Sequence, residues 1–120
     1  IGGDVYASSG FYTTANNYPD YVFEDYFKGA SAINSDYKFT PLNEAIAYVK
    51  KNGHLPNVAS LKEVKANNMQ IDLKETTIKN LEKIEENFIY ISELKNENET
   101  LKRRIEKLEK IINKMYEDEK

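Results

Sequence analysis

The sequence predicts a mainly α-helical protein with a short N-terminal β-segment, built as a small α+β head followed by a long parallel coiled coil. Three observations support this fold class. Apolar side chains recur at every third or fourth position from Leu81 to Met115, with no glycine or proline between them. Eleven of the fourteen aromatic residues lie in the first fifty positions. Residues 71–120 instead hold thirteen acidic and eleven basic side chains, which is typical of a solvated helical stalk.

The size of the chain predicts that the protein assembles with copies of itself. The stalk leaves only about seventy residues for a head, and a unit of that size usually needs a metal, a disulfide or a partner chain. The chain has no cysteine and a single histidine, so we expect no metal site and no cofactor, and oligomerisation remains. A lone helix also cannot bury its own apolar stripe. Because the chain begins with Ile1, we expect it to be a piece of a longer protein.

Charge and hydropathy exclude two classes of partner. The formal charge of −3 argues against nucleic acid, because phosphate neutralisation needs a basic face. No apolar run approaches membrane-spanning length, so we expect no membrane insertion. Composition divides the chain into an N-terminal β-region at residues 1–15, a head at 16–70 and a coiled-coil stalk at 71–118.

The first forty residues predict strands, a turn and a loop. Residues 2–14 are β-branched, aromatic or small, with glycines as punctuation, so we expect one or two short strands. Such a strand needs an edge to pair with, from upstream sequence or from a neighbouring subunit. Residues 16–20 are expected to form a turn, and residues 21–23 (Tyr-Val-Phe) a compact apolar anchor. The small residues of 28–35 predict a surface loop.

Two short helices are expected before the stalk. The first has Thr40 as its N-cap and Pro41 at its first position, and it ends at Asn52, before Gly53 as a left-handed C-cap. Its apolar face consists of Leu42, Ala45, Ile46 and Val49.

The second short helix runs from Leu61 to about Ala66, because residues 60–63 (Ser-Leu-Lys-Glu) match a capping box. Between the two helices, residues 54–56 are expected to be extended. The stalk begins near residue 71 or 72.

The apolar seam of the stalk follows two heptad registers. From Leu94 to Met115, isoleucine or asparagine occupies position a, and leucine or methionine occupies position d. From Leu81 to Ile91, leucine and phenylalanine occupy a and isoleucine occupies d. The step from Ile91 to Leu94 is three residues where four are due, a stammer that should overwind the supercoil. The expected oligomer interface comprises Leu81, Ile84, Phe88, Ile91, Leu94, Asn98, Leu101, Arg104, Ile105, Leu108, Glu109, Ile112 and Met115.

Three sequence signals bear on the number of helices in the coiled coil. Isoleucine at a with leucine at d favours a dimer, as does Asn98 at a, whereas Leu81 and Phe88 at a with isoleucine at d favour a higher state. The segment from Arg104 to Glu109 resembles the Arg-apolar-x-x-apolar-Glu trimerisation signature. In it, the arginine covers the seam and bonds the glutamate of a neighbour. We favour a homotrimer, with a dimer as the alternative.

Several motifs together resemble one family of modules: Pro19–Phe23, Tyr37, Leu42, Glu44, Asn52–Pro56, Ser60 and Glu63-Val64. They are similar to the C-terminal module of tail-fibre-like and cell-surface proteins from Bacteroidetes and their phages, which ends in a coiled coil. The resemblance covers residues 19–115, and the His-Leu-Pro segment is its most specific part. The family motif, assigned a structural role, consists of Asp20, Tyr21, Val22, Phe23, Gly53, His54, Leu55, Pro56, Ser60 and Glu63.

The opening block also carries a resemblance. Residues 3–8 with Phe11 and Tyr12 resemble the strand that leads into intramolecular-chaperone domains of the endosialidase type. The resemblance implies that residues 1–15 end a fibre body and that the remainder is a trimeric cap, which aligns the β-rich fibre. Such a cap has a physical reason: non-local strand pairing must overcome loop-closure entropy, and a coiled coil raises the local concentration of the chains.

Many chaperone domains of that type cut themselves off beside a Ser-Asp pair, but the sequence disfavours this chemistry here. At the corresponding position the chain has residues 14–16 (Thr-Ala-Asn). Its only Ser-Asp pair is Ser35-Asp36, within the loop, and a serine nucleophile needs a base such as His54 or Lys38 within reach. We therefore expect no catalytic residue and no enzymatic activity.

His54 and the tyrosines leave alternatives open. His54 is a candidate catalytic base or intersubunit pH switch, but a hydrogen bond to the preceding helix end or to the Asp20 region is favoured. Six tyrosines invite a carbohydrate- or receptor-binding role, although a small aromatic core explains them as well and is favoured. They are Tyr6, Tyr12, Tyr18, Tyr21, Tyr26 and Tyr37.

The sequence thus predicts a C-terminal trimerisation or chaperone-like assembly module of a phage tail fibre or bacterial surface fibre. The alternatives are a fibre-tip module that binds a host receptor or glycan, and a self-cleaving chaperone peptidase. The expected partners are further copies of the chain and an upstream fibre domain, with a cell-surface ligand under the binding alternative. The expected location is the virion tail fibre or the cell exterior.

Overall fold

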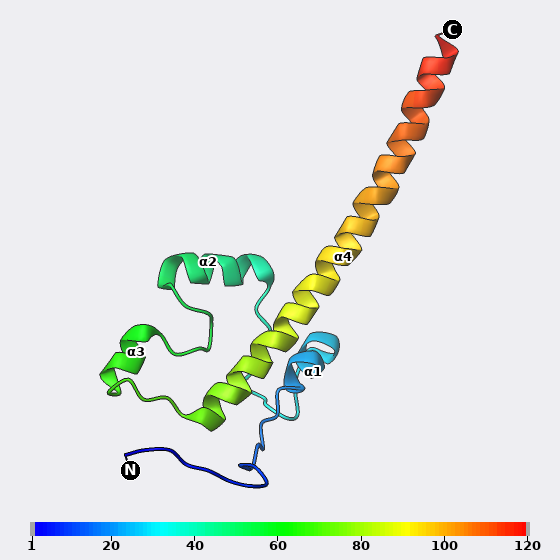
Figure 1. The fold of residues 1–120 in the computed structure, drawn as a ribbon. Coiled ribbons are helices and arrows are strands. Elements are labelled where there is room, and N and C mark those ends of the chain that lie inside the picture. The colour runs from blue at the N-terminus through cyan, green and yellow to red at the C-terminus, as the bar shows by residue number, and fades with distance from the viewer. Residues whose placement is uncertain (1, 120) are drawn as a thin grey trace. The chain divides into compact units, whose positions relative to one another are not determined.

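The computed structural model describes residues 2–119 and is helical, as the sequence predicts (Figure 1). Contacts divide the chain into a head unit, Ile1–Glu85, and a distal unit, Glu86–Lys120. The long C-terminal helix is confirmed, and it contributes residues to both units. The described helices are α1 (Tyr21–Lys28), α2 (Leu42–Asn52), α3 (Leu61–Ala66) and α4 (Leu73–Asp118).

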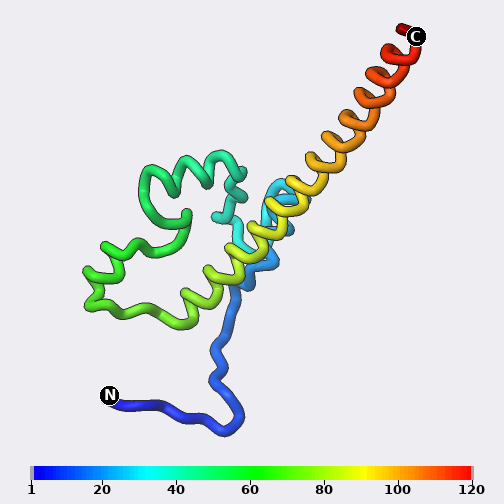
Figure 2. Tube along the Cα trace, turned by 45° about the horizontal axis from the view of Figure 1, so that its top comes forward, coloured from blue at the N-terminus to red at the C-terminus, as the bar shows by residue number. Residues whose placement is uncertain are grey.

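The N-terminal strands expected at residues 2–14 are not formed, and residues 2–119 contain no strand. The head unit is therefore helical rather than α+β over the described residues. Residues 2–17 form an irregular, drawn-out segment (Figure 2) whose described amides and carbonyls make no hydrogen bond to another backbone group. A side chain does reach this backbone, since the Tyr12 hydroxyl donates to the Ser9 carbonyl over 2.8 Å. The physical reason is that a strand needs a partner edge, and residues 18–119 supply none.

Helix α1 corrects the interpretation of residues 21–23 as a simple apolar anchor. The segment is the first turn of an eight-residue helix. The Val22 amide donates to the Pro19 carbonyl over 2.8 Å, and Gly29 ends the helix in a left-handed conformation with φ 84°. Aromatic residues and aspartate favour helices weakly, so local propensity gives little signal here. Burial of one side of the helix provides the stabilisation that propensity lacks.

The core of the head unit is small and aromatic. Tyr21 is 1% exposed, Val22 is fully buried, and Tyr37 is 3% exposed. The rings of Tyr21 and Tyr37 lie with their centroids 4.8 Å apart in a tilted arrangement, a favourable geometry for aromatic pairs. Pro19 is also fully buried beside the start of α1. The aromatic-core interpretation therefore holds for Tyr21 and Tyr37 among the six tyrosines.

The loop after α1 is held by two carboxylates of that helix. Glu24 accepts from the amides of Ala32 and Ile33. A hydrogen bond from the Ser31 side chain, followed by the one from the Ala32 amide, holds the pKa of Glu24 below its usual value. Asp25 accepts from the Phe39 amide over 2.8 Å. The loop expected at residues 28–35 is therefore present, and its path is fixed by hydrogen bonds to α1.

Helices α2 and α3 follow the local rules closely. Gly53 takes the expected left-handed C-cap conformation, with φ 75°. The expected capping box at α3 is also present, with the Glu63 amide donating to the Ser60 hydroxyl over 3.1 Å. Pro41 rather than Thr40 is the N-cap of α2, because Pro41 has an extended ψ of 148° and helical geometry begins one residue later. No residue of either helix is buried.

The head unit buries charged side chains of α4. Glu82 is fully buried, accepts from the Tyr21 hydroxyl over 2.5 Å, and lies 3.1 Å from the Lys83 ammonium group. Glu85 is 7% exposed, and one of its carboxylate oxygens has no hydrogen-bond partner. Burial, followed by a hydrogen bond with the Asp20 carboxyl and the charge of Asp20, raises the pKa of Glu85 to about 7. At neutral pH about half of the Glu85 carboxyls are therefore ionised, in surroundings that disfavour the charged form.

This raised pKa predicts a pH-dependent stability. Because the native pKa of Glu85 lies above its unfolded value, the native state binds the extra proton between about pH 4.5 and pH 7. The free energy of unfolding should fall as the pH rises through that window, by up to about 3 kcal/mol. Glu85→Gln keeps the shape without the charge, so it should be more stable than the parent at pH 8 and similar at pH 5. Urea denaturation followed by circular dichroism, at fixed chain concentration, measures this.

Glu117→Gln provides the control, because Glu117 is an exposed glutamate near the end of α4. It should follow the pH profile of the parent. Parallel pH profiles for the parent and Glu85→Gln would contradict the burial argument.

Candidate oligomer interface

Helix α4 uses its polar side to complete the head unit and leaves its apolar side uncovered. Glu82, Lys83 and Glu85 are buried, whereas Ile84, which lies among them in sequence, is 61% exposed. Leu81 is half-buried. Successive residues of a helix are separated by about 100°, so the two groups face different directions. The head unit therefore does not use the predicted seam as its own core.

The same apolar side stays exposed through the distal unit. Its apolar seam residues have exposed fractions between 51% for Leu94 and 65% for Ile91. Ile89 and Tyr90, outside the seam, are buried. Water contact with such a long apolar stripe is unfavourable by about 25 cal/mol for each Å². We call the stripe the seam: Leu81, Ile84, Phe88, Ile91, Leu94, Asn98, Leu101, Ile105, Leu108, Ile112 and Met115.

The stammer does not break the helix. Helix α4 is continuous from Leu73 to Asp118, so the shortened step from Ile91 to Leu94 is absorbed without a loop. A shallow hollow of about 550 Å³ lies at this point, lined by Ile91, Leu94, Lys95, Glu97, Asn98 and Leu101. The change of register thus coincides with open space beside the seam, where a side chain of a neighbouring helix has room.

Charged positions beside the seam suit a parallel arrangement. Arg104 at g and Glu109 at e are both exposed, and they are five residues apart, the spacing at which g and e positions of parallel neighbours meet. Glu97 and Lys102 repeat this g-to-e pattern one heptad earlier with the charges exchanged, and both are exposed. The ion pair within this stretch of the chain joins Lys95 to Glu99 over 3.7 Å. It does not involve the four g and e side chains, which can therefore pair with a neighbouring helix.

Two interface candidates were missed by the sequence analysis. Ile111 and Tyr116 occupy the next g and e positions, and they are 50% and 63% exposed. Apolar residues at g and e widen the seam beyond a and d, and a wider stripe suits more than two helices. The signal that identifies them is the heptad register itself, once it is extended to the flanking positions.

The family-motif residues lie in structural positions of the head unit. Asp20 precedes α1, while Tyr21 and Val22 form its buried side and Phe23 is half-buried. Gly53 ends α2, and Ser60 with Glu63 caps α3. Pro56 is half-buried, and Leu55 is 48% exposed.

His54 makes its hydrogen bonds with residues close to it in the sequence. Its Nδ1 lies 2.9 Å from the Leu55 carbonyl oxygen, and its Nε2 lies 3.5 Å from the Tyr48 hydroxyl. A protonated Nδ1 donates to the carbonyl, which leaves Nε2 to accept from Tyr48. The two rings meet edge to face, with centroids 5.3 Å apart. The side chain thus ties the end of α2 to the following loop.

The Ser35-Asp36 pair lies exposed in the loop after α1. The Asp36 amide donates to the Asn34 side chain over 3.2 Å, which makes the pair part of a polar turn. Among the described residues, the Ser35 hydroxyl makes no hydrogen bond. His54 is engaged with Tyr48 and Leu55.

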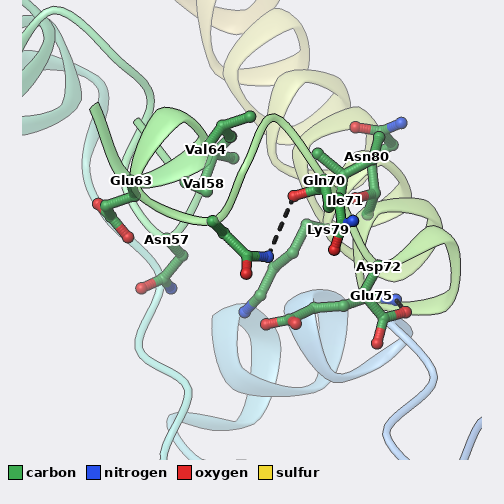
Figure 3. Close-up of a pocket in the computed structure, with 13 residues that line it drawn as sticks. Asn57, Val58, Glu63, Val64, Gln70, Ile71, Asp72, Glu75, Lys79 and Asn80 are labelled. Atoms are coloured by element: carbon green, nitrogen blue, oxygen red, sulfur yellow. Dashed lines mark hydrogen bonds between the residues drawn. The ribbon is translucent and has the colours of Figure 1, made fainter. Parts of the chain in front are cut away.

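Two hollows lie within the head unit. A cleft of about 400 Å³ lies between the α3 region and the first turns of α4, where Glu63, Asp72, Glu75 and Lys79 contribute side chains (Figure 3). An Asn67 amide that donates to the Gln70 carbonyl over 3.3 Å spans part of it.

The second hollow is an apolar groove of about 440 Å³. Phe11 and Tyr12 of the N-terminal segment contribute to it, and so do Tyr18 and Leu81, the first residue of the seam. Tyr12 is 89% exposed and Tyr18 is 51% exposed, so neither belongs to an aromatic core. We call this hollow the aromatic groove. The remaining lining residues are Thr13, Ala15, Pro19, Leu73, Lys74, Thr77 and Ile78.

Comparison of the chain with protein-family profiles, with curated proteins and with solved structures found no match. Over residues 2–119, no helix has the length and apolar character that a bilayer crossing requires. The same part of the chain contains no group of three or more histidine, cysteine, aspartate or glutamate side chains placed to hold a metal ion. The seam, whose apolar side chains from Ile84 onward are more than half exposed, is the strongest candidate functional surface of the described residues.

A charge placed in the seam should prevent assembly. Leu101→Asp introduces a carboxylate at a d position, where burial of the charged form is costly, so oligomerisation should weaken by at least about 100-fold. Thr100→Asp is the matched control, because it adds the same charge one residue away from the seam. Light scattering over a dilution series measures the mass. Equal masses for both variants at every concentration would contradict the assignment of the interface.

Proposed function

We propose that the chain is a parallel trimerisation module that assembles and aligns the C-terminal end of a fibre protein. The observation that carries this proposal is the exposed seam, which continues along α4 after the polar side of the helix has completed the head unit. Association of copies removes this stripe from water, and the free energy gained scales with the area covered. The proposal includes two further points: that the parent protein is a tail fibre or surface fibre, as the resemblance implies, and that it lies on a virion or cell surface.

Three features favour a parallel trimer over a dimer. The Arg104–Glu109 segment has the trimerisation signature, and Ile111 with Tyr116 extends the apolar stripe to g and e. Phenylalanine at a, as in Phe88, also needs more room than the centre of a two-stranded coil provides. Asn98 at a then fixes the register, because asparagines at one level can satisfy one another only when the chains are aligned.

The N-terminal segment supplies the second part of the proposal. Residues 2–17 leave their described backbone groups without backbone partners, and Val5, Tyr6, Phe11 and Tyr12 are exposed β-formers. We place the expected strand in the assembled fibre, where an upstream domain or a neighbouring copy provides the missing edge. A coiled coil that holds the chains together lowers the entropic cost of that pairing.

Cysteine mapping tests both the interface and its polarity, because the chain has no cysteine of its own. Leu94→Cys and Met115→Cys each place a thiol at a d position, about 31 Å apart along the helix. In a parallel, aligned assembly each variant should form a disulfide with its own copies under mild oxidation. A mixture of the two should give no 94-to-115 cross-link.

Asn113→Cys, at an outward b position, is the control and should cross-link poorly. A cross-link between Leu94→Cys and Met115→Cys chains would establish an antiparallel pair, and a chain that remains a folded monomer would overturn the proposal. The measured mass of the reduced protein distinguishes a trimer from a dimer.

The aromatic groove favours a second candidate function, a fibre-tip module that binds a neutral cell-surface glycan. Aromatic faces stack on sugar rings, and Tyr12 and Tyr18 offer exposed rings beside Thr77 and Lys74 as polar groups. Tyr37, by contrast, is 3% exposed and has no surface to offer a ligand.

Under this second function, Tyr12→Ala should abolish binding in a screen of immobilised bacterial oligosaccharides. Tyr6→Ala is the matched control, since Tyr6 is 86% exposed but lies outside the groove, and it should bind like the parent. Retained binding by Tyr12→Ala would remove the groove as the binding site. Circular dichroism checks that both variants keep the parent helix content.

A further inference from the structure

Four basic side chains form a line on one side of the distal unit. Arg103, Lys107, Lys110 and Lys114 follow one another at steps of four, three and four residues on α4. This spacing confines them to an arc of about 60° around the helix and to a length of about 16 Å. We call these four residues the basic ladder.

The basic ladder lies opposite the seam. Leu101, Ile105 and Leu108 occupy the a and d positions, whereas the ladder residues occupy c and f, on the other side of the helix. All four ladder residues are exposed in the single chain. They stay exposed when the seam is covered, because c and f positions point away from the axis of a coiled coil.

The charge of the ladder is not neutralised within the chain. Over the described residues, none of the four side chains forms an ion pair, and Arg103 makes one hydrogen bond, to the Thr100 hydroxyl over 3.4 Å. Residues 102–114 contain six basic and two acidic side chains in a chain whose net charge is −3. Glu106 flanks the ladder, and Glu99 and Glu117 mark its two ends. The ladder is therefore a short basic surface with an acidic residue at each end.

We propose that the basic ladder binds an acidic polysaccharide, through carboxylates carried on successive sugar rings. Adjacent cations in the ladder are separated by about 4.5–6 Å along the helix, and lysine and arginine side chains form strong charge-assisted hydrogen bonds with carboxylates. The inference rests on the proposed assembly in one respect. The trimer keeps the ladders outward and supplies three of them, which converts weak single contacts into avid binding.

Charge count and composition favour this ligand over two others. A single ladder offers four cations before it meets Glu99 and Glu117, fewer than the roughly six to ten phosphate contacts of a strongly salt-dependent nucleic-acid complex. Single-stranded nucleic acid also needs aromatic stacking platforms, and residues 99–115 contain no aromatic side chain. An anionic membrane would require apolar residues beside the cations, but Thr100, Glu106 and Asn113 lie there.

Neutralisation of the ladder tests the proposal. The variant Arg103→Gln/Lys107→Gln/Lys110→Gln/Lys114→Gln removes four charges with little change in helix propensity. The matched control, Lys50→Gln/Lys51→Gln/Lys62→Gln/Lys65→Gln, removes four exposed charges from α2 and α3. The probe is a fluorescein-labelled polygalacturonate fragment, with binding followed by fluorescence anisotropy at low and at physiological salt.

We expect the ladder variant to lose at least about tenfold in affinity together with most of its salt dependence. The control should change by less than about twofold. Equal losses in the two variants would overturn the proposal, because they would show that net charge alone attracts the probe. Binding of duplex DNA or of anionic lipid vesicles as tight as that of the polygalacturonate, at equal charge concentration, would also overturn it.

Light scattering on the same samples separates this inference from the proposed function. The ladder variant should keep the mass of the parent, since its substitutions lie outside the seam. A monomeric parent that still binds the probe through the ladder would refute the assembly and retain the ligand. A trimeric parent that binds no probe would refute the ligand and retain the assembly.

Discussion

The attachment of α1 to the polar side of α4 decides how the rest of the chain is used. The Tyr21 hydroxyl donates to Glu82, and Glu82 is buried beside Lys83. Buried charges are tolerated when they are paired and hydrogen-bonded, so this contact allows a polar side to serve as a packing surface. If α1 had packed on the apolar side instead, part of the seam would have been consumed by the head unit. The observed arrangement leaves the seam available.

The same contact carries an electrostatic cost. Glu85 is buried near Asp20, and its raised pKa records the unfavourable environment of the charged form. The apolar core that offsets this cost is small, since Tyr21, Val22 and Tyr37 are its main buried members. Helices α2 and α3 add no buried residue. A head unit of this kind has little stability to spare, which is consistent with a chain that gains stability by assembly.

Charge is distributed along α4 in a way that supports both proposals. Residues 82–99 hold six acidic and two basic side chains, and residues 102–114 hold six basic and two acidic ones. Around the helix the side chains are separated as well: a and d carry the seam, e and g carry complementary charges between Glu97 and Glu109, and c and f carry the basic ladder. One helix can therefore mediate self-association and ligand binding at once, because each uses a different side.

The sequence by itself determined the elements that local rules specify. The capping box at Ser60, the left-handed cap at Gly53 and the period of α4 all depend on residues a few positions apart. The tertiary structure alone decided that residues 21–28 form a helix, that the N-terminal segment remains unpaired, and which side of α4 is buried. These outcomes depend on contacts such as that between Tyr21 and Glu82, 61 positions apart, whose partners no local pattern identifies. A strand, likewise, exists only when another chain segment offers its edge.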